Sequence, residues 1–204
     1  MNPRLQQQID FICEIDRLKT VLRQTLLMDS SRQENSAEHS WHLALMALTL
    51  AEYAPPNVDI PRAIKQLLIH DLVEIDAGDT FCYDAAANLN KAEREQAAAD
   101  RLFGLLPADQ QTEIRQLWQE FEDQATPTAR FAAAIDRIQP LLHNQRTAGG
   151  TWKQHGITRE QVMRRMAPVE TGAPELWPFV LKTIEACTAA GYIADQATHS
   201  AAAS

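Results

Sequence analysis

One carboxylate stands inside an apolar helical stripe, and the fold has to accommodate it. Within residues 60–76, positions at the i, i+3, i+4, i+7 and i+11 spacing form one buried helix face. These positions are Ile64, Leu67, Leu68, Asp71 and Ile75, so one acidic residue interrupts an otherwise apolar stripe. An unpaired carboxylate in such a place destabilises a fold by several kcal/mol. His70 and Glu74 lie beside Asp71 on the same surface. We therefore expect three ionisable groups to converge there and to need a common partner.

A second helical stripe, within residues 126–145, also carries an acidic residue at its edge. Asp136 stands beside Ala132 and Ala133, whose small side chains leave room for another group to approach. A third predicted helix carries a histidine, His39, in its first turn. Two imidazoles together with two carboxylates suit Zn²⁺, Mn²⁺, Co²⁺ or Fe²⁺ better than Ca²⁺. The sequence thus predicts a metal site from four residues: His39, His70, Asp71 and Asp136.

The remainder of the chain also favours helices, because residues that break them are few. Among 204 residues only 7 are glycine and 10 are proline, and no internal repeat or linker divides the chain. Periodicity and breakers predict helices over 4–27, 36–53, 59–76, 88–106, 107–122, 126–145, 158–166 and 174–190. The expected N-caps are Asn35 or Ser36, Asp59 and Thr126. We predict an all-α, single-domain helical bundle over residues 1–190, with a loop at 149–158 and a disordered tail over 191–204.

Composition excludes several classes of partner. The formal charge is −8, from 19 basic and 27 acidic residues, so a basic face for a nucleic acid polymer is not expected. No apolar run approaches the roughly 20 residues that cross a bilayer, and the N-terminus lacks the apolar core of a signal peptide. The three cysteines, Cys13, Cys82 and Cys187, form neither a disulfide framework nor a metal knuckle. These features predict a cytoplasmic protein without membrane partners.

Three short motifs occur in the order His, His-Asp, Asp. The segments "RQENSAEHSWH", "HDLVEIDAGD" and "AIDRIQPLL" contain His39, the pair His70-Asp71, and Asp136. This ordered set resembles the HD-domain metal-dependent phosphohydrolases, and more closely the branch that contains the bacterial 5'-deoxynucleotidases. The resemblance spans roughly residues 10 to 190. It implies an all-helical HD-type fold, commonly a homodimer, that hydrolyses nucleoside 5'-monophosphates to nucleoside and phosphate.

The resemblance also assigns roles to individual residues. It makes His39, His70, Asp71 and Asp136 the metal ligands, and Glu74 and Asp79 the acids that activate water and protonate the leaving oxygen. For binding the substrate phosphate, Arg23 resembles the family's arginine at the end of the first helix, and Arg32 is a second candidate. HD enzymes with two metals carry extra histidines between the His-Asp pair and the last aspartate. None lies between Asp71 and Asp136, which predicts one divalent ion: Co, Mn, Zn, Fe or Mg.

Some alternatives stay open at the level of sequence. Beside Arg23, where the deoxynucleotidases have a tryptophan that helps to distinguish sugars, this chain has Gln24 and Thr25. A phosphate ester that is not a nucleotide is therefore an alternative substrate, and a non-catalytic nucleotide-binding HD protein or a scaffold with a structural metal are alternative functions. The remaining histidines in the folded region are expected to be hydrogen-bonded core residues: His42, His143 and His155.

Overall fold

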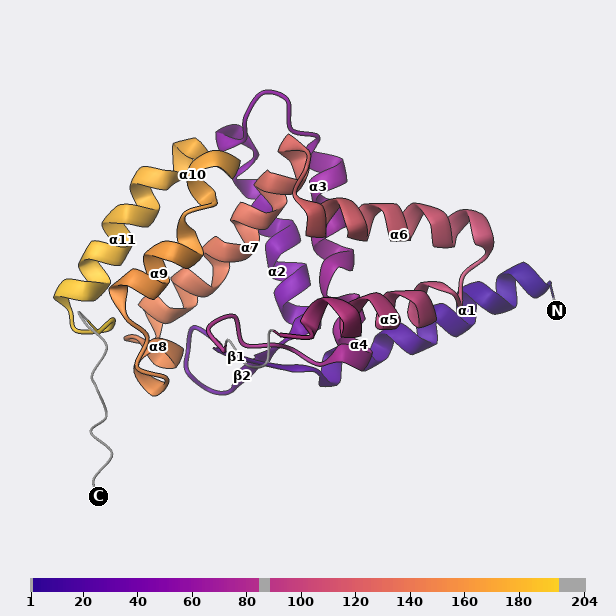
Figure 1. The fold of residues 1–204 in the computed structure, drawn as a ribbon, viewed down its shortest axis with the longest axis horizontal. Helices are drawn as coiled ribbons and strands as arrows, with labels where there is room; N and C mark the ends of the chain where they lie inside the picture. Colours follow the sequence, from indigo (N-terminus) through magenta and orange to yellow (C-terminus); the bar gives the residue numbers. More distant parts are fainter. Residues whose placement is uncertain (1, 85–88, 195–204) are drawn as a thin grey trace, which may run out of the picture.

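Helices build most of the described chain. The computed structural model describes residues 2–84 and 89–194. Its α-helices are α1 Pro3–Ile15, α2 Ser36–Thr49, α3 Ile60–Ile69, α4 Glu74–Ala77, α5 Lys91–Phe103, α6 Ala108–Asp123, α7 Pro127–Arg146, α8 Gly150–Gln154, α9 Arg159–Met166, α10 Val169–Gly172 and α11 Trp177–Ala189. Short 3₁₀ turns are η1 Asp16–Thr20, η2 Ala51–Tyr53, η3 His70–Val73 and η4 Pro174–Leu176. The predicted all-α class is confirmed (Figure 1).

Side-chain caps fix where three of these helices begin. The Asn35 side chain accepts a hydrogen bond from the Glu38 backbone N–H at 2.9 Å, and the Glu38 carboxylate accepts one from the Asn35 N–H at 3.2 Å. This reciprocal capping box starts α2 and leaves His39 in the first turn. At α3 and α7 the cap is one-sided, because the Asp59 and Thr126 side chains each accept one hydrogen bond from a backbone N–H of the first turn, and each is followed by a proline in that turn. All three predicted starts are confirmed.

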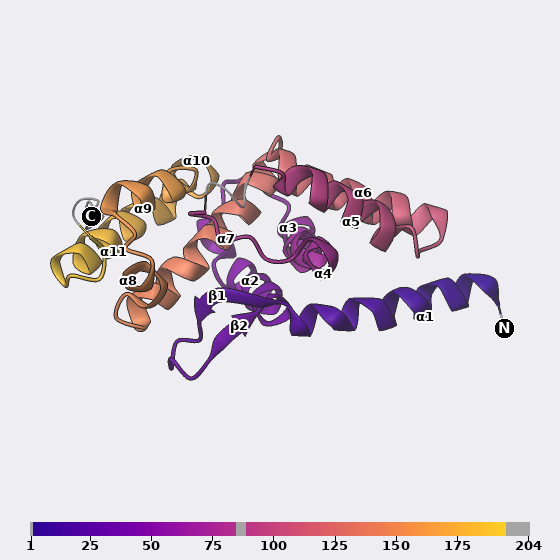
Figure 2. The same cartoon turned by 60° about the horizontal axis from the view of Figure 1, so that its bottom comes forward.

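The predicted first helix is wrong in its second half. The helix α1 ends at Ile15, and after η1 the chain forms β1, Leu22–Leu26, which pairs antiparallel with β2, Gln33–Asn35. Helical spacing continues through this segment, but pairing with the second strand of the hairpin overrides it. Figure 2 shows the hairpin beside α2, where α1 ends. Arg23 therefore projects from a strand and not from the end of a helix.

Three other boundaries differ from the prediction. The helix expected over 59–76 tightens into η3 at His70–Val73 before α4, and all four of these residues are buried. The predicted loop at 149–158 contains α8. The predicted domain end at 190 lies too early, because Ile193 is buried and the Ala194 backbone N–H donates to the Ile157 carbonyl at 3.1 Å. The rest of the predicted tail, 195–204, lies outside the described residues.

The elements gather around two apolar clusters. The helices α8 to α11 lie at one end of the molecule, α1, α5 and α6 lie at the other, and α2, α3 and α7 run between them (Figure 1). One cluster joins α2, α3 and α7 with the C-terminal helices, and the other joins α1, η1, η3, α5 and α6. The segment from Leu67 to Leu72 passes from one cluster to the other, so His70 and Asp71 lie at their junction. Across the described ranges, no helix is both long and apolar enough to span a bilayer.

Candidate active site

Three elements bring the four predicted metal ligands together. His39 comes from α2, His70 and Asp71 come from η3, and Asp136 comes from α7. His39 Nε2 lies 3.0 Å from Asp136 Oδ1 and 3.9 Å from Asp71 Oδ2. His70 Nε2 lies 3.0 Å from Asp71 Oδ1 and 3.8 Å from Asp136 Oδ1. Four nitrogen and oxygen donors from segments up to 97 residues apart therefore face one small volume.

The tautomer of His70 tests whether a cation fits this volume. His70 Nδ1 lies 2.9 Å from the Leu67 carbonyl oxygen, which can only accept, so Nδ1 carries the proton. Burial lowers the pKa of His70, which keeps the ring neutral. Its Nε2 lone pair therefore points at two carboxylates, and this buried atom has no hydrogen-bond partner in the described part of the chain. A lone pair facing negative oxygens is unfavourable without a cation, so the donor set fits a divalent metal ion.

His39 carries a proton where a metal would bind. The ring is fully buried. Burial and the Arg23 charge lower the pKa of His39, but the hydrogen bond with Asp136 and the nearby Glu34 carboxylate, whose Oε2 lies 3.6 Å from Nδ1, outweigh them and raise it to about 9. Burial also acts to raise the pKa of Asp136, yet the hydrogen bond with His39 holds it well below its usual range. In the metal-free protein, a proton on His39 thus compensates part of the negative charge that a cation would otherwise balance.

Two further carboxylates lie beside this centre without joining its closest contacts. Glu74 is buried, and the Ser36 hydroxyl donates a hydrogen bond of 2.6 Å to its Oε2. Burial, assisted by the Asp71 charge, raises the pKa of Glu74 well above its usual range. Asp79 follows Gly78, whose φ of +75° ends α4 and turns the chain toward the cavity. Burial raises the pKa of Asp79 as well. A carboxyl group with a raised pKa is a stronger base once it is ionised.

The two predicted phosphate-binding arginines differ in position. Arg23 Nη1 lies 3.1 Å from Asp71 Oδ2 and 3.7 Å from Asp79 Oδ1, so this guanidinium reaches the centre. Its pKa is raised further, because the Asp71 and Glu74 charges outweigh the opposing effect of burial. Arg32 is exposed and forms a bidentate pair with Glu38, at 2.9 and 2.6 Å. The structure does not bring Arg32 to the other site residues.

A cavity of about 230 Å³ opens onto the centre. Its walls include Gln24 and Thr25 from β1 and Trp152 from α8. Arg165 of α9 also lines it, with Nη2 3.5 Å from Asp136 Oδ2. The lining thus combines the carboxylates of the centre with two arginines and with polar and aromatic side chains, a mixture that suits an anionic ester with an organic group.

Sequence reasoning did not identify Arg165 or Glu34. Glu34 belongs to the quoted motif "RQENSAEHSWH" and stands directly before the Asn35 cap, but no apolar periodicity marks it as buried. Its exposed fraction is 1%, which is unusual for a carboxylate outside a paired site. Arg165 lies in a helix with mostly polar residues, and only the packing of α9 against α7 brings it to Asp136. No local signal in the sequence indicates that contact.

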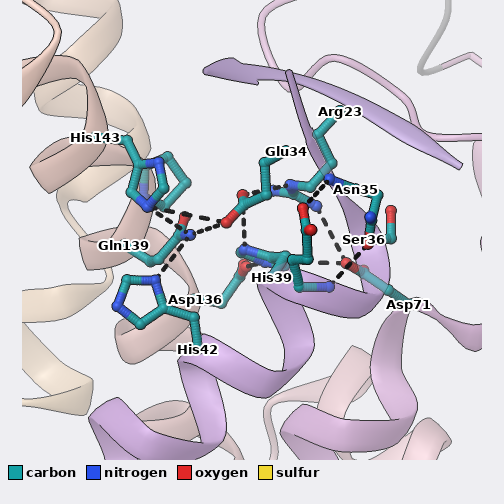
Figure 3. A network of polar contacts seen from close by, with 12 residues as sticks. Arg23, Glu34, Asn35, Ser36, His39, His42, Asp71, Asp136, Gln139 and His143 are labelled. Atoms are coloured by element: carbon teal, nitrogen blue, oxygen red, sulfur yellow. Dashed lines mark hydrogen bonds and ion pairs between the residues drawn. The ribbon is translucent and has the colours of Figure 1, made fainter. Parts of the chain in front are cut away.

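Behind His39 lies a second group of buried polar side chains (Figure 3). Gln139 Nε2 lies 2.6 Å from Glu34 Oε1, 2.9 Å from His143 Nε2 and 3.4 Å from His42 Nδ1. His143 is buried and hydrogen-bonded as expected, and His42 is half-buried. The same expectation is wrong for His155, which is exposed and lies against Phe81 in a tilted arrangement, with ring centroids 4.6 Å apart.

Comparison with known proteins places this arrangement in a family. The sequence matches the HD domain family over residues 15–177, which covers most of the chain and all four predicted ligands. The chain belongs to the HD domain family. The resemblance to HD-domain phosphohydrolases, and with it the expectation of an enzyme, is confirmed at the level of that family.

Several proteins with a named activity or a solved structure are similar to this HD-family chain. It is 33% identical to 5'-deoxynucleotidase HDDC2 of Xenopus laevis over 135 residues, 66% of each chain, and 29% identical to that of Danio rerio over 139 residues, 68% of each. The chain thus spans about two thirds of the length of these curated relatives. A "Predicted metal-dependent phosphohydrolase" from Magnetospirillum magnetotacticum MS-1 is 55% identical, with a TM-score of 0.90 over 95% of this chain and 100% of the other. The PH0347 protein of Pyrococcus horikoshii OT3 shares the fold, at 19% identity and a TM-score of 0.63 over 87% and 98%.

Proposed function

We propose that this protein is a metal-dependent phosphomonoesterase that hydrolyses nucleoside 5'-monophosphates, including 2'-deoxy forms, to nucleoside and phosphate. The convergence of His39, His70, Asp71 and Asp136, with Glu74 and Asp79 beside them, is the observation that carries the proposal. The names of the HDDC2 relatives support the substrate class. The cavity lining, which includes arginines beside the carboxylates together with the aromatic side chains of Phe81, Tyr83 and Trp152, supports an anionic ester.

Each of these site residues has its own role in the reaction. A divalent ion held by His39, His70, Asp71 and Asp136 would supply Lewis acidity and lower the pKa of a water molecule. Glu74 accepts the proton of the attacking water, and the Ser36 hydroxyl holds its carboxylate in place. Arg23 grips non-bridging phosphate oxygens through its planar guanidinium. Asp79, whose pKa is raised by burial, gives a proton to the leaving 5'-oxygen.

One metal ion per chain is part of the proposal. The histidine-free interval between Asp71 and Asp136 supports it. The other described group of suitable ligands, Glu34, His42 and His143, surrounds the Gln139 amide nitrogen, which fills the central position. The nature of the ion, among Co, Mn, Zn, Fe and Mg, is not fixed by the donor set, since two imidazoles and two carboxylates suit several of them.

We further propose that the protein is a homodimer in the cytoplasm. Trp41, Leu45 and Leu48 form an apolar stripe on the outer face of α2, with exposed fractions of 61%, 43% and 59%. Such a stripe at i, i+4, i+7 spacing supports a helix-to-helix contact between copies. The cysteines Cys13, Cys82 and Cys187 are free thiols, which supports a reducing compartment.

Phosphate release from a panel of substrates tests the proposed activity. Metal-stripped protein reloaded with each candidate ion is assayed against ribo- and deoxynucleoside monophosphates and against small phosphomonoesters. We expect metal-dependent release of phosphate from the nucleoside monophosphates. Release only from the other esters would favour the alternative substrate class, and tight nucleotide binding without release would favour a non-catalytic binding protein.

A further inference from the structure

A single buried carboxylate lies between the metal site and the phosphate-binding arginine. Glu34 projects from β2 and is 1% exposed. Its Oε2 lies 3.6 Å from His39 Nδ1 and 3.5 Å from Arg23 Nε. Figure 3 shows the Glu34 side chain between these two residues on one side and Gln139 and His143 on the other. A carboxylate so placed contacts both a proposed metal ligand and the proposed phosphate-binding residue.

The atoms that face one another here are complementary. Arg23 Nε, Glu34 Oε2 and His39 Nδ1 are buried, and none has a hydrogen-bond partner within bonding distance among the described residues. Arg23 Nε is always a donor, and His39 Nδ1 must carry the proton whenever Nε2 offers its lone pair to a metal. Glu34 Oε2 is the acceptor that lies a few tenths of an ångström too far from both. A small movement closes both hydrogen bonds at once.

The other oxygen of Glu34 is held firmly. Gln139 Nε2 donates to Glu34 Oε1 at 2.6 Å. His143 donates from Nδ1 to the Leu26 carbonyl at 2.7 Å, so its Nε2 is an acceptor that lies 2.9 Å from the same amide nitrogen. The amide therefore occupies the space between Glu34, His42 and His143, where a second cation would otherwise fit. This group fixes Glu34 from behind and leaves Oε2 directed at His39 and Arg23.

We propose that Glu34 is a positioning residue that serves both halves of the site. It holds His39 with Nε2 toward the metal, and it holds Arg23 with its terminal nitrogens toward the substrate phosphate. The inference rests on the proposed function. Because metal-binding histidines are oriented by the hydrogen bonds that they donate to outer carboxylates, loss of such a carboxylate typically weakens metal affinity by about 10–100-fold. Loss of Glu34 should weaken phosphate binding as well, and this joint effect distinguishes it from a residue that supports His39 alone.

Binding measurements on Glu34→Gln test the proposal without relying on turnover. Metal-stripped protein is titrated with Co²⁺ by calorimetry, with the visible spectrum of Co²⁺ as a second readout. Inorganic phosphate is then titrated at saturating Co²⁺. We expect the Co²⁺ Kd to rise by about 10–100-fold, the spectrum to change, and the phosphate Kd to rise at full metal occupancy. Glu120→Gln is the control, because Glu120 is a partly buried carboxylate that also pairs with an arginine, Arg62, and it does not line the cavity. It should lower the Tm and leave both Kd values unchanged.

The results of these titrations distinguish a failure of the role of Glu34 from a failure of the proposed function. A folded Glu34→Gln with wild-type Kd values for Co²⁺ and phosphate overturns the proposal, and a loss of metal affinity alone overturns the role of Glu34 toward Arg23. If Glu34→Gln does not fold, Glu34→Asp keeps the charge but shortens the reach, and both Kd values should again rise. A wild-type protein that binds Co²⁺ and phosphate but hydrolyses no ester contradicts the proposed function and leaves the role of Glu34 intact.

Discussion

At the scale of single residues, Glu74 separates chemistry from metal binding. Its carboxylate is buried and hydrogen-bonded to Ser36, and it makes no close contact with His39 or His70 among those described. Glu74→Gln keeps the shape of the side chain but removes its basicity. We expect metal content to stay at the wild-type level while kcat falls by roughly 10²–10⁴-fold. Both are measured on the same preparation, and a variant that loses its metal would make Glu74 a ligand and move water activation to Asp79.

The proton on His39 predicts how metal affinity varies with pH. The pKa of His39 is about 9 in the folded, metal-free protein, above the 6.5 of a free imidazole. This proton stabilises the metal-free fold fully below the unfolded pKa, and its contribution disappears as the pH rises through about 9. A metal must displace it. The Mn²⁺ Kd, measured by calorimetry between pH 6.5 and 9, should fall by up to about tenfold per pH unit. A Kd that is constant over this range would contradict the assignment of His39 as a ligand.

Gln24 and Thr25 predict weak discrimination between sugars. Both line the cavity beside Arg23, and their polar groups can hydrogen-bond a 2'-hydroxyl. An apolar wall rejects an added hydroxyl by only about a hundredfold, and this wall is partly polar. We expect kcat/KM for dAMP and AMP to lie within about tenfold of each other. Arg23→Ala should lower both alike, because it would bind phosphate and not sugar. A strong deoxy preference in the wild type would assign selectivity to another wall, such as that of Trp152.

At the scale of elements, Gly172 sets how closely α10 approaches α7. A Cβ at this position would lie 2.3 Å from the backbone oxygen of Arg130. Since backbone must move to admit it, we expect Gly172→Ala to lower the free energy of unfolding by about 1–3 kcal/mol or more. Thr171→Ala, at the adjacent exposed residue, should change it by less than about 0.5 kcal/mol. Equal stability of the two variants in urea unfolding would show that α10 is not packed as described.

Local signals and tertiary packing explain which elements the sequence could predict. The starts of α2, α3 and α7 follow from Asn35, Asp59 and Thr126, because a cap needs only its own first turn. The strand β1 was missed, because its pairing with β2 contradicts the helical spacing of residues 18–26. The tightened turn η3 was missed for a similar reason. Packing of η3 against α2, α5 and α6 favours it, and this packing cannot be read from the sequence of one helical turn.

At the scale of the whole molecule, the stripe on α2 predicts association. Replacing Trp41 by Glu places a charge in the apolar stripe formed with Leu45 and Leu48. We expect sedimentation velocity to show a dimer for the wild type and a monomer for Trp41→Glu at the same micromolar concentration. Leu89→Glu, which changes another exposed leucine away from α2, is the control and should remain dimeric. A monomeric wild type would contradict the proposed homodimer.

The assembly of the site explains how far its residues could be predicted. Ionisable groups set in apolar stripes marked His70, Asp71, Glu74 and Asp136 without knowledge of the fold, and family resemblance added Asp79 and Arg23. Glu34 and Arg165 required the fold, because a hairpin and the packing of α9 bring them to the centre. Arg32 is the opposite case, because the sequence suggested it for the site and the fold places it elsewhere. It is the first residue of the motif "RQENSAEHSWH", but its pair with Glu38 holds it at the surface.

Metal content and turnover of Asp71→Ala, measured on one sample, test the central claim most directly. Asp71 contacts His70 Nε2 at 3.0 Å and Arg23 Nη1 at 3.1 Å, so its removal opens the centre on two sides. Loss of an outer partner typically costs about 10–100-fold in metal affinity or activity, and loss of a ligand should cost more. Asp76→Ala, five residues along and paired with Arg101 at the surface, is the control. The account predicts that Asp71→Ala loses bound metal and phosphate release together while Asp76→Ala retains both. An Asp71→Ala protein with full metal content and wild-type turnover would contradict it.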